Sequence, residues 1–317
     1  MKTLKSSGCL RAALILAVFA APNLPRFAFA ASGGAGKGTS AAQFLKLGSG
    51  ARAAGMGEAY SAVCADAGAV YWNPGALGGL NGISGTFTHT DLFGALNYEY
   101  LGYTQSFKKF GTVGLGVQYL SAGRIAETDV DGLETGSAMN PVQIAVALAY
   151  GRKIGGFGIG AAAKYIRSRL VETAETLASD AGILSPGLFN NKFRLAFVVQ
   201  NAGRGLKYDK ASDPLPLNLK LGGAFSFSDR LILGLDFNFP RDNRVYAGAG
   251  GEYLFHYSAV SFAGRLGYNT LTTGDLDGLS GVSTGLGVMF RNLALDYAFV
   301  PFGALGNAHK ISLNFKF

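Results

Sequence analysis

Few side chains in this sequence have the types and spacing that catalysis needs. The three histidines, His89, His256 and His309, lie far apart, and none has a cysteine or carboxylate at metal-ligand spacing. A hydrolytic nucleophile would need a serine beside a histidine on neighbouring strands, and we identify no such pair. We therefore predict no catalytic residue, no metal site and no cofactor, and we expect that the protein is not an enzyme.

Two acidic tetrapeptides and one glycine run imitate ligand-binding loops. Asp129-Val130-Asp131-Gly132 and Asp275-Leu276-Asp277-Gly278 begin like calcium loops, but neither continues with the remaining ligands. Tight acidic turns are the favoured interpretation, with calcium binding as the alternative. The run Gly155–Gly160 lacks the Lys-Ser/Thr ending of a phosphate loop, so we interpret it as strand glycines.

One turn has a composition that suits a moving part. Asn73-Pro74-Gly75 directly follows Tyr71 and Trp72. Because proline fixes its own φ, such a turn is rigid and can move as a unit with the aromatic rings beside it. If the protein has a passage to open or close, these five residues are the predicted gate.

Composition limits the fold that can surround this turn. Glycine accounts for 47 of the 317 residues, and charged residues for 15%, against roughly 25% in soluble domains. So much glycine disfavours long helices, and beyond the N-terminus no run of about 20 apolar residues could form a transmembrane helix. Of the fold classes considered, an all-β protein that is compatible with a membrane is the one left.

From residue 82 onward the chain alternates apolar and polar side chains with a period of two. At the end, Ile311, Leu313, Phe315 and Phe317 oppose Ser312, Asn314 and Lys316. Fourteen such segments are expected, and an even number suits a closed outer-membrane barrel. They are 82–92, 96–107, 110–121, 141–151, 156–170, 176–187, 192–201, 215–227, 230–239, 243–255, 258–269, 280–290, 292–300 and 308–317.

The alternation does not by itself say which face is outside. A soluble sandwich or a lipocalin-like barrel would need more charge than this chain has, so lipid outside is favoured. Small-residue faces would then point inward, at Gly114, Gly116, Gly158, Gly160, Gly285 and Gly287. Aromatic belts are expected from Tyr98, Tyr100, Tyr103, Phe107, Tyr119, Phe225, Phe237, Phe239, Tyr297 and Phe299. Charge pairs bracing the interior are expected among Asp236, Arg194, Lys220, Lys164, Arg265 and Asp296.

The connections alternate between short and mostly long, as expected for periplasmic turns and external loops. We interpret the terminal aromatics Phe315 and Phe317 as a signal for the outer-membrane assembly machinery. The stretch 31–81 lacks strand alternation and is rich in small residues, so it is predicted to be a plug inside the barrel formed by 82–317. Short helices are expected near Ser40–Lys46 and Met56–Ala65. A periplasmic tail or linker is the alternative for this stretch.

The first 30 residues predict export. Three basic residues precede an apolar run at 12–21, and Ala28-Phe29-Ala30 matches a signal-peptidase site, so 1–30 is predicted to be a signal peptide. Its removal lowers the formal net charge from +8 to +4, because it contains four basic residues and no acidic one. No basic stripe remains for nucleic acid. Cys64 is left as the single cysteine, interpreted as a buried thiol.

Both ends of the mature chain resemble one family. Gly50-Ala51-Arg52-Ala53-Ala54-Gly55-Met56-Gly57, Ala65-Asp66-Ala67 and Tyr71-Trp72-Asn73-Pro74-Gly75-Ala76-Leu77 resemble the N-terminal signature of the PorV/PorQ family, which is related to FadL-type outer-membrane transporters of long-chain fatty acids. Leu295–Gly303 and His309–Leu313 resemble its C-terminal end. The one departure noted is Gly75-Ala76, where the family usually has alanine first.

The resemblance implies a fourteen-stranded outer-membrane barrel with an N-terminal plug, and two functions. In FadL-type relatives, hydrophobic molecules enter from outside and leave sideways through the wall, so the first expectation is a passive channel for hydrophobic small molecules or fatty acids. The PorV branch implies an accessory or shuttle of a type IX secretion system, which holds exported cargo at the surface. A purely structural barrel is a third possibility. The expected partners are the lipid bilayer, such ligands, secretion-system components and the assembly machinery.

Overall fold

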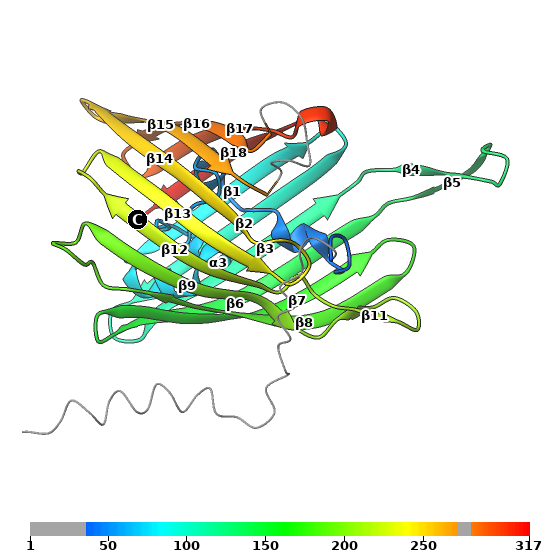
Figure 1. Ribbon diagram of the computed structural model, residues 1–317, viewed down its shortest axis with the longest axis horizontal. Coiled ribbons are helices and arrows are strands. Elements are labelled where there is room, and N and C mark those ends of the chain that lie inside the picture. Colours follow the sequence, from blue (N-terminus) through cyan, green and yellow to red (C-terminus); the bar gives the residue numbers. More distant parts are fainter. Residues whose placement is uncertain (1–35, 272–279) are drawn as a thin grey trace, which may run out of the picture. The chain divides into compact units, whose positions relative to one another are not determined.

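The computed structural model describes residues 36–271 and 280–317, and the predicted signal peptide lies outside these ranges. Fourteen long strands close into one antiparallel barrel (Figure 1). The wall strands are β1 (Ile83–Leu92), β2 (Leu96–Phe107), β3 (Gly111–Ser121), β6 (Val142–Ile154), β7 (Phe157–Arg169), β8 (Thr173–Leu184), β9 (Phe193–Gly203), β12 (Asn218–Ser226), β13 (Leu231–Pro240), β14 (Tyr246–Tyr257), β15 (Val260–Asn269), β16 (Val282–Phe290), β17 (Leu293–Pro301) and β18 (Asn307–Lys316).

Each wall strand pairs with the next wall strand along the chain, and the first pairs with the last. Phe87 of β1 lies opposite Leu313 of β18, which closes the ring. The predicted number of strands and their antiparallel closure are therefore confirmed. Closure satisfies the backbone groups of every strand, as a lipid environment requires. Among the described residues, no helix is long and apolar enough to cross a membrane.

Two short hairpins interrupt the long connections and were not predicted. β4 (Ile125–Thr128) pairs with β5 (Glu134–Met139), and β10 (Leu206–Lys207) pairs with β11 (Ser212–Asp213). Both lie at the end of the barrel where the long connections gather, which we call the long-loop end. The opposite end, where the short turns connect the strands, is the short-turn end.

One strand is displaced from its predicted position by three residues. The expected segment 176–187 is β8 at Thr173–Leu184, because a tight turn at 170–172 starts the strand opposite Arg169 of β7. The pairing of β8 with β9 is irregular between Ser179 and Ala181. There the carboxylate of Asp180 accepts the backbone N–H of Asn201 at 2.8 Å.

The alternation sorts side chains as predicted, with one correction to the aromatic belts. Leu101 and Tyr103 of β2 are exposed on the outer face, whereas Tyr98 and Tyr100 are buried inside. The predicted place of these two tyrosines at an interface is wrong, because they lie on the same face as Gly102, which points into the barrel. The hydroxyl of Tyr98 donates to the carbonyl of Leu47 at 2.9 Å, so its polar end is satisfied inside.

A segment of short helices and turns fills the interior, and we call residues 40–80 the plug. It contains η2 (Gln43–Lys46), α2 (Ala51–Gly55), α3 (Ala69–Trp72) and η3 (Pro74–Gly79). The predicted helix at Met56–Ala65 is wrong. Gly57 and Glu58 both have a φ of 63°, which ends any helix there. The N–H groups of Tyr60 and Ser61 donate to Asp236 of the wall at 3.3 and 2.9 Å.

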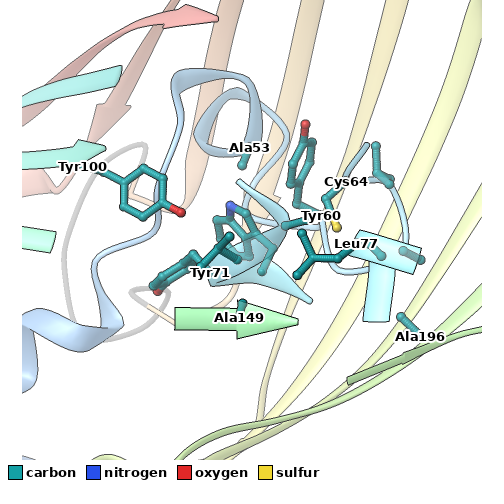
Figure 2. Close-up of a cluster of buried hydrophobic side chains, with 14 of the residues drawn as sticks. Ala53, Tyr60, Cys64, Tyr71, Leu77, Tyr100, Ala149 and Ala196 are labelled. Carbon is teal, nitrogen blue, oxygen red and sulfur yellow. The ribbon is translucent and has the colours of Figure 1, made fainter. Parts of the chain in front are cut away.

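The hydrophobic core therefore lies between plug and wall. Figure 2 shows Tyr60, Tyr71 and Leu77 of the plug within one buried cluster that also contains Tyr100 and Ala149 of the wall. Trp72, also in the cluster, makes edge-on contacts with Tyr71 and Tyr60, with ring centroids 5.0 and 5.9 Å apart. The interior of this barrel is packed like the core of a small globular domain.

Candidate functional site

The luminal glycines of the wall form the seat of the plug. A Cβ atom at Gly158, Gly160 or Gly182 would lie closer than 3.0 Å to plug atoms of Gly75, Pro74 or Asn73. The same holds at wall positions Gly114, Gly116, Gly151, Gly222, Gly234, Gly248, Gly250 and Gly267. Only glycine lets two backbones approach this closely. Most of the small-residue positions found in the sequence thus face the plug, either its backbone or the side chain of Val70. The exception is Gly287, which faces Arg265 and Asp296 of the wall.

Asn73, the first residue of the predicted gate turn, ties the plug to itself and to the wall. Its side chain is fully buried, and its Nδ2 donates to the carbonyl oxygens of Ser61 at 3.0 Å and Ile183 at 3.4 Å. Its Oδ1 accepts the N–H of Gly75 at 2.9 Å, which caps η3. One amide side chain thus fixes the turn against β8.

The structure brings all five predicted gate residues together and buries them. The indole N–H of Trp72 donates to the carbonyl of Ser49 at 2.9 Å, and the Tyr71 hydroxyl donates to that of Leu45 at 3.2 Å. The ammonium group of Lys220 lies 4.5 Å from the centre of the Trp72 ring. In this arrangement, the five residues hold the plug in place.

A chain of buried charges links the plug to three strands. Arg52 of α2 and Arg265 of β15 both bind the Glu252 carboxylate, at 2.6 and 2.7 Å, and Arg265 also binds Asp296 at 2.8 Å. Arg265 and Asp296 were both among the residues expected to form charge pairs in the interior, and they pair with each other. Arg52 and Glu252 were missed as partners, although Arg52 stands in the Gly-Ala-Arg-Ala motif at the start of the plug.

A second polar contact secures η2 at the long-loop end. Lys46 and Gln43 donate to the same oxygen of Asp242, at 2.6 and 2.9 Å, in the loop between β13 and β14. Burial alone would raise the pKa of Asp242. The hydrogen bonds from Lys46 and Gln43 outweigh that effect, so the pKa of this carboxyl is lowered from its usual value. We call this contact the latch.

An apolar pocket of about 170 Å³ lies between the plug and strands β1 and β15–β18, near the latch. Leu92, Val300, Phe302 and Ala308 are among its apolar walls, and Glu58 and Lys310 also line it. Lys310 is buried and donates to the carbonyl of Gly48 at 2.7 Å. The volume suits one small apolar molecule or one large side chain. Sequence reasoning missed this pocket, because residues from five separate strands and the plug form it.

The hairpin of β4 and β5 extends away from the wall at the long-loop end (Figure 1). All residues from 125 to 137 are exposed, including Val130 and Leu133, and four of them are acidic. At its tip, Asp129 accepts the N–H groups of Asp131 and Leu133 at 2.9 and 3.0 Å, so the first acidic motif forms a tight turn. The second, at 275–278, lies outside the described residues. No group that could hold a metal occurs in the part of the chain that is described. The expectation that no serine lies beside a histidine on neighbouring strands is wrong, because the strand register places Nδ1 of His256 in β14 2.7 Å from the hydroxyl of Ser261 in β15.

The two C-terminal aromatics face outward at the short-turn end. The rings of Phe315 and Phe317 lie 5.9 Å apart, and Phe315 covers Gly85 of β1, where a side chain would collide with the ring. The N–H of Ile83 donates to the carbonyl of Phe317 at 2.8 Å, so the last residue takes part in barrel closure. Their role as an assembly signal stays a prediction.

The sequence profile of the type IX secretion system protein PorV matches residues 35–238, which is more than half of the chain and includes the plug, both hairpins and the seat glycines as far as Gly234. The chain belongs to the PorV family. No curated protein matches this PorV-family chain.

Solved structures with a similar fold are hydrocarbon channels and transporters. The TodX deltaS2S3 mutant monoaromatic hydrocarbon channel has 13% identity and a TM-score of 0.56, with 85% of this chain and 99% of that chain covered. The CymD monoaromatic hydrocarbon channel has 13% identity, a TM-score of 0.56 and coverages of 86% and 98%. The toluene transporter TbuX of Ralstonia pickettii has 14% identity, a TM-score of 0.55 and coverages of 85% and 98%. At such identities the likeness supports the fold of this PorV-family chain, a closed outer-membrane barrel, and does not identify a ligand.

Proposed function

We propose that this protein is a non-enzymatic outer-membrane accessory of a type IX secretion system, which holds a protein partner at the long-loop end of its barrel. Membership of the PorV family supports the secretion role. The fit of the plug supports the accessory role over that of an open conduit. Plug atoms lie against luminal glycines from β3 to β15, and buried charges bind the plug to the wall.

The single observation that carries the proposal is the exposed hairpin β4–β5. Its acidic residues Glu127, Asp129, Asp131 and Glu134 surround two exposed apolar side chains, Val130 and Leu133. An apolar centre with a polar rim is the usual arrangement of a protein-binding surface. A partner with basic residues around an apolar cleft would complement it.

The proposal is tested by replacing residues 126–137 with a two-residue turn in the full chain. We expect a deletion strain that carries this variant to release exported cargo that the wild type keeps at the surface. Secretion-system components should no longer co-purify with the variant. The matched control is the double substitution Lys207→Gln and Lys210→Gln in the other hairpin. Normal cargo retention and unchanged co-purification with the shortened hairpin would contradict the proposal.

The apolar pocket beside Lys310 favours a second function, passage of hydrophobic small molecules. Under this alternative a ligand such as a fatty acid enters at the long-loop end, and Tyr71 to Gly75 move as a gate. An uptake assay with a labelled fatty acid separates the two functions. Uptake that depends on this protein, with unchanged cargo retention in its absence, would favour the conduit.

The remaining expectations on targeting and organisation belong to the same proposal. Residues 1–30 act as a cleaved signal peptide, 31–81 form the plug, and 82–317 form the barrel. Phe315 and Phe317 guide insertion by the assembly machinery. N-terminal sequencing of the membrane-extracted protein tests the cleavage after Ala30.

A further inference from the structure

The short-turn end of the barrel carries an unusual excess of positive charge. Asp229 is the one acidic residue among the described connections and strand ends there. Eight exposed basic residues accompany it, and none makes an ion pair within the described part of the chain. They are Lys108, Lys109, Arg152, Lys153, Lys192, Arg230, Arg291 and Lys316. The long-loop end, in contrast, mixes both signs, with the acidic hairpin among them.

Half of these basic residues lie on two neighbouring turns. Lys108 and Lys109 follow β2, whereas Arg152 and Lys153 end β6, and β3 and β6 are paired from Thr112 opposite Gly151 onward. A Cβ at Gly111 would lie 3.0 Å from Arg152 Cβ, so the two turns are in direct contact. These four exposed residues therefore lie together at one edge of the short-turn end, and we call them the basic patch.

Exposed aromatic rings surround the basic patch on the lipid side. Phe110 lies between Phe107 and Tyr150, with ring centroids 6.4 and 5.0 Å away. The Tyr150 hydroxyl donates to the carbonyl of Phe110, which fixes the turn. Phe107, Phe110 and Phe157 are each between 45% and 59% exposed. Aromatic rings of this kind lie at the level of lipid headgroups, so they place the cationic groups in the headgroup layer.

We infer that the basic patch is a binding site for anionic phospholipids of the leaflet at the short-turn end. In barrels of this kind, short turns face the periplasm, where the leaflet is made of phospholipids. The ammonium and guanidinium groups bind the lipid phosphate, while the acyl chains lie along the aromatic rings. The inference rests on the barrel spanning a membrane and not on the secretion role.

The experiment uses the full, folded chain in detergent and counts bound lipids by native mass spectrometry. The probes are phosphatidylglycerol, phosphatidylcholine and inorganic phosphate. We expect the wild type to prefer phosphatidylglycerol over phosphatidylcholine. A basic residue near an anionic lipid surface contributes about fivefold to affinity. In the quadruple variant Lys108→Gln, Lys109→Gln, Arg152→Gln and Lys153→Gln, the ratio of phosphatidylglycerol to phosphatidylcholine affinity should therefore fall at least about tenfold.

The matched control removes four exposed basic residues from the long-loop end instead. These substitutions are Arg124→Gln, Arg204→Gln, Lys207→Gln and Lys210→Gln. An unchanged preference in the patch variant would overturn the inference. So would an equal loss in the control, because total charge would then explain it. Inorganic phosphate that binds as tightly as phosphatidylglycerol would also overturn it. Heat-modifiable migration checks folding. If the quadruple variant is unfolded, the double variants at 108 and 109 and at 152 and 153 are measured separately, and each should lose part of the preference for phosphatidylglycerol.

Discussion

Gly160 of β7 and Pro74 of the plug are in direct backbone contact, so that a Cβ at position 160 would collide with the Pro74 carbonyl. This contact joins the wall to the predicted gate turn. It makes a wall glycine a determinant of plug position.

Replacing Gly160 by alanine should displace the plug or strain the wall. Overpacking of this kind costs about 1–3 kcal/mol, which should lower the temperature at which heat-modifiable migration changes. Gly264→Ala is the matched control, because Gly264 lies in β15 and no atom lies within 4 Å of the added Cβ. Equal stability of the two variants would show that the seat does not depend on glycine at this position.

Asn73→Ala should loosen the same turn by a different route. The substitution removes the acceptor for the Gly75 N–H and the donor to Ser61, inside the barrel where water is scarce. Each buried group left unpaired costs about 1–3 kcal/mol. Urea unfolding should reveal the loss, whereas Asn292→Ala, at an exposed position, should change stability by less than about 0.5 kcal/mol. If Asn73→Ala leaves the stability against urea unchanged, this amide does not hold the turn in place.

Glu252→Gln should destabilise the protein far more than a surface substitution does. It removes the carboxylate shared by Arg52 and Arg265, and breaking such a buried ion pair costs about 3–5 kcal/mol. The exposed pair of Arg167 and Glu175, 3.4 Å apart, offers the control, and Glu175→Gln should cost less than about 1 kcal/mol. Thermal unfolding of both variants measures these losses of stability. Comparable losses in the two variants would show that the buried charge network does not stabilise the protein more than a surface pair.

The latch should open in acid. The pKa of Asp242 is lowered in the folded protein, so the latch contributes its full stability above the ordinary aspartate pKa and loses it as the pH falls through the lowered value. Hydrogen exchange at Gln43–Lys46 should therefore accelerate below about pH 4. In Asp242→Asn the exchange should be fast at neutral pH and show no such step. If exchange in this variant accelerates by the same amount as the pH falls, the titrating group is not Asp242.

Cys64 should report on the plug. Burial is the largest influence that raises the pKa of its thiol, and the carboxylates of Asp66 and Asp236 raise it further, so little reactive thiolate forms. Maleimide labelling should be slow in the native protein, faster in Gly160→Ala and complete after unfolding. Rapid labelling of the native protein would mean that the plug leaves its seat spontaneously.

Local pattern was sufficient to predict the wall of this protein. A period of two, repeated between turn residues, predicted fourteen strands within a few residues of their ends, because alternation is a property of each strand alone. The low fraction of charged residues indicated that the apolar face of the strands meets lipid. The motif Tyr71 to Gly75 also stood out, since Asn73-Pro74-Gly75 is a turn sequence that strands disfavour.

The site itself was decided by tertiary structure. Tyr98 and Tyr100 were predicted at an interface because aromatics there are common, but register placed them inside against the plug. The helix expected at Met56–Ala65 gave way to turns, because wall Asp236 binds the N–H groups that a helix would use. The glycine seat, the pocket and the basic patch each join strands far apart in sequence. Such contacts exist only once the ring closes, so no local pattern determines them.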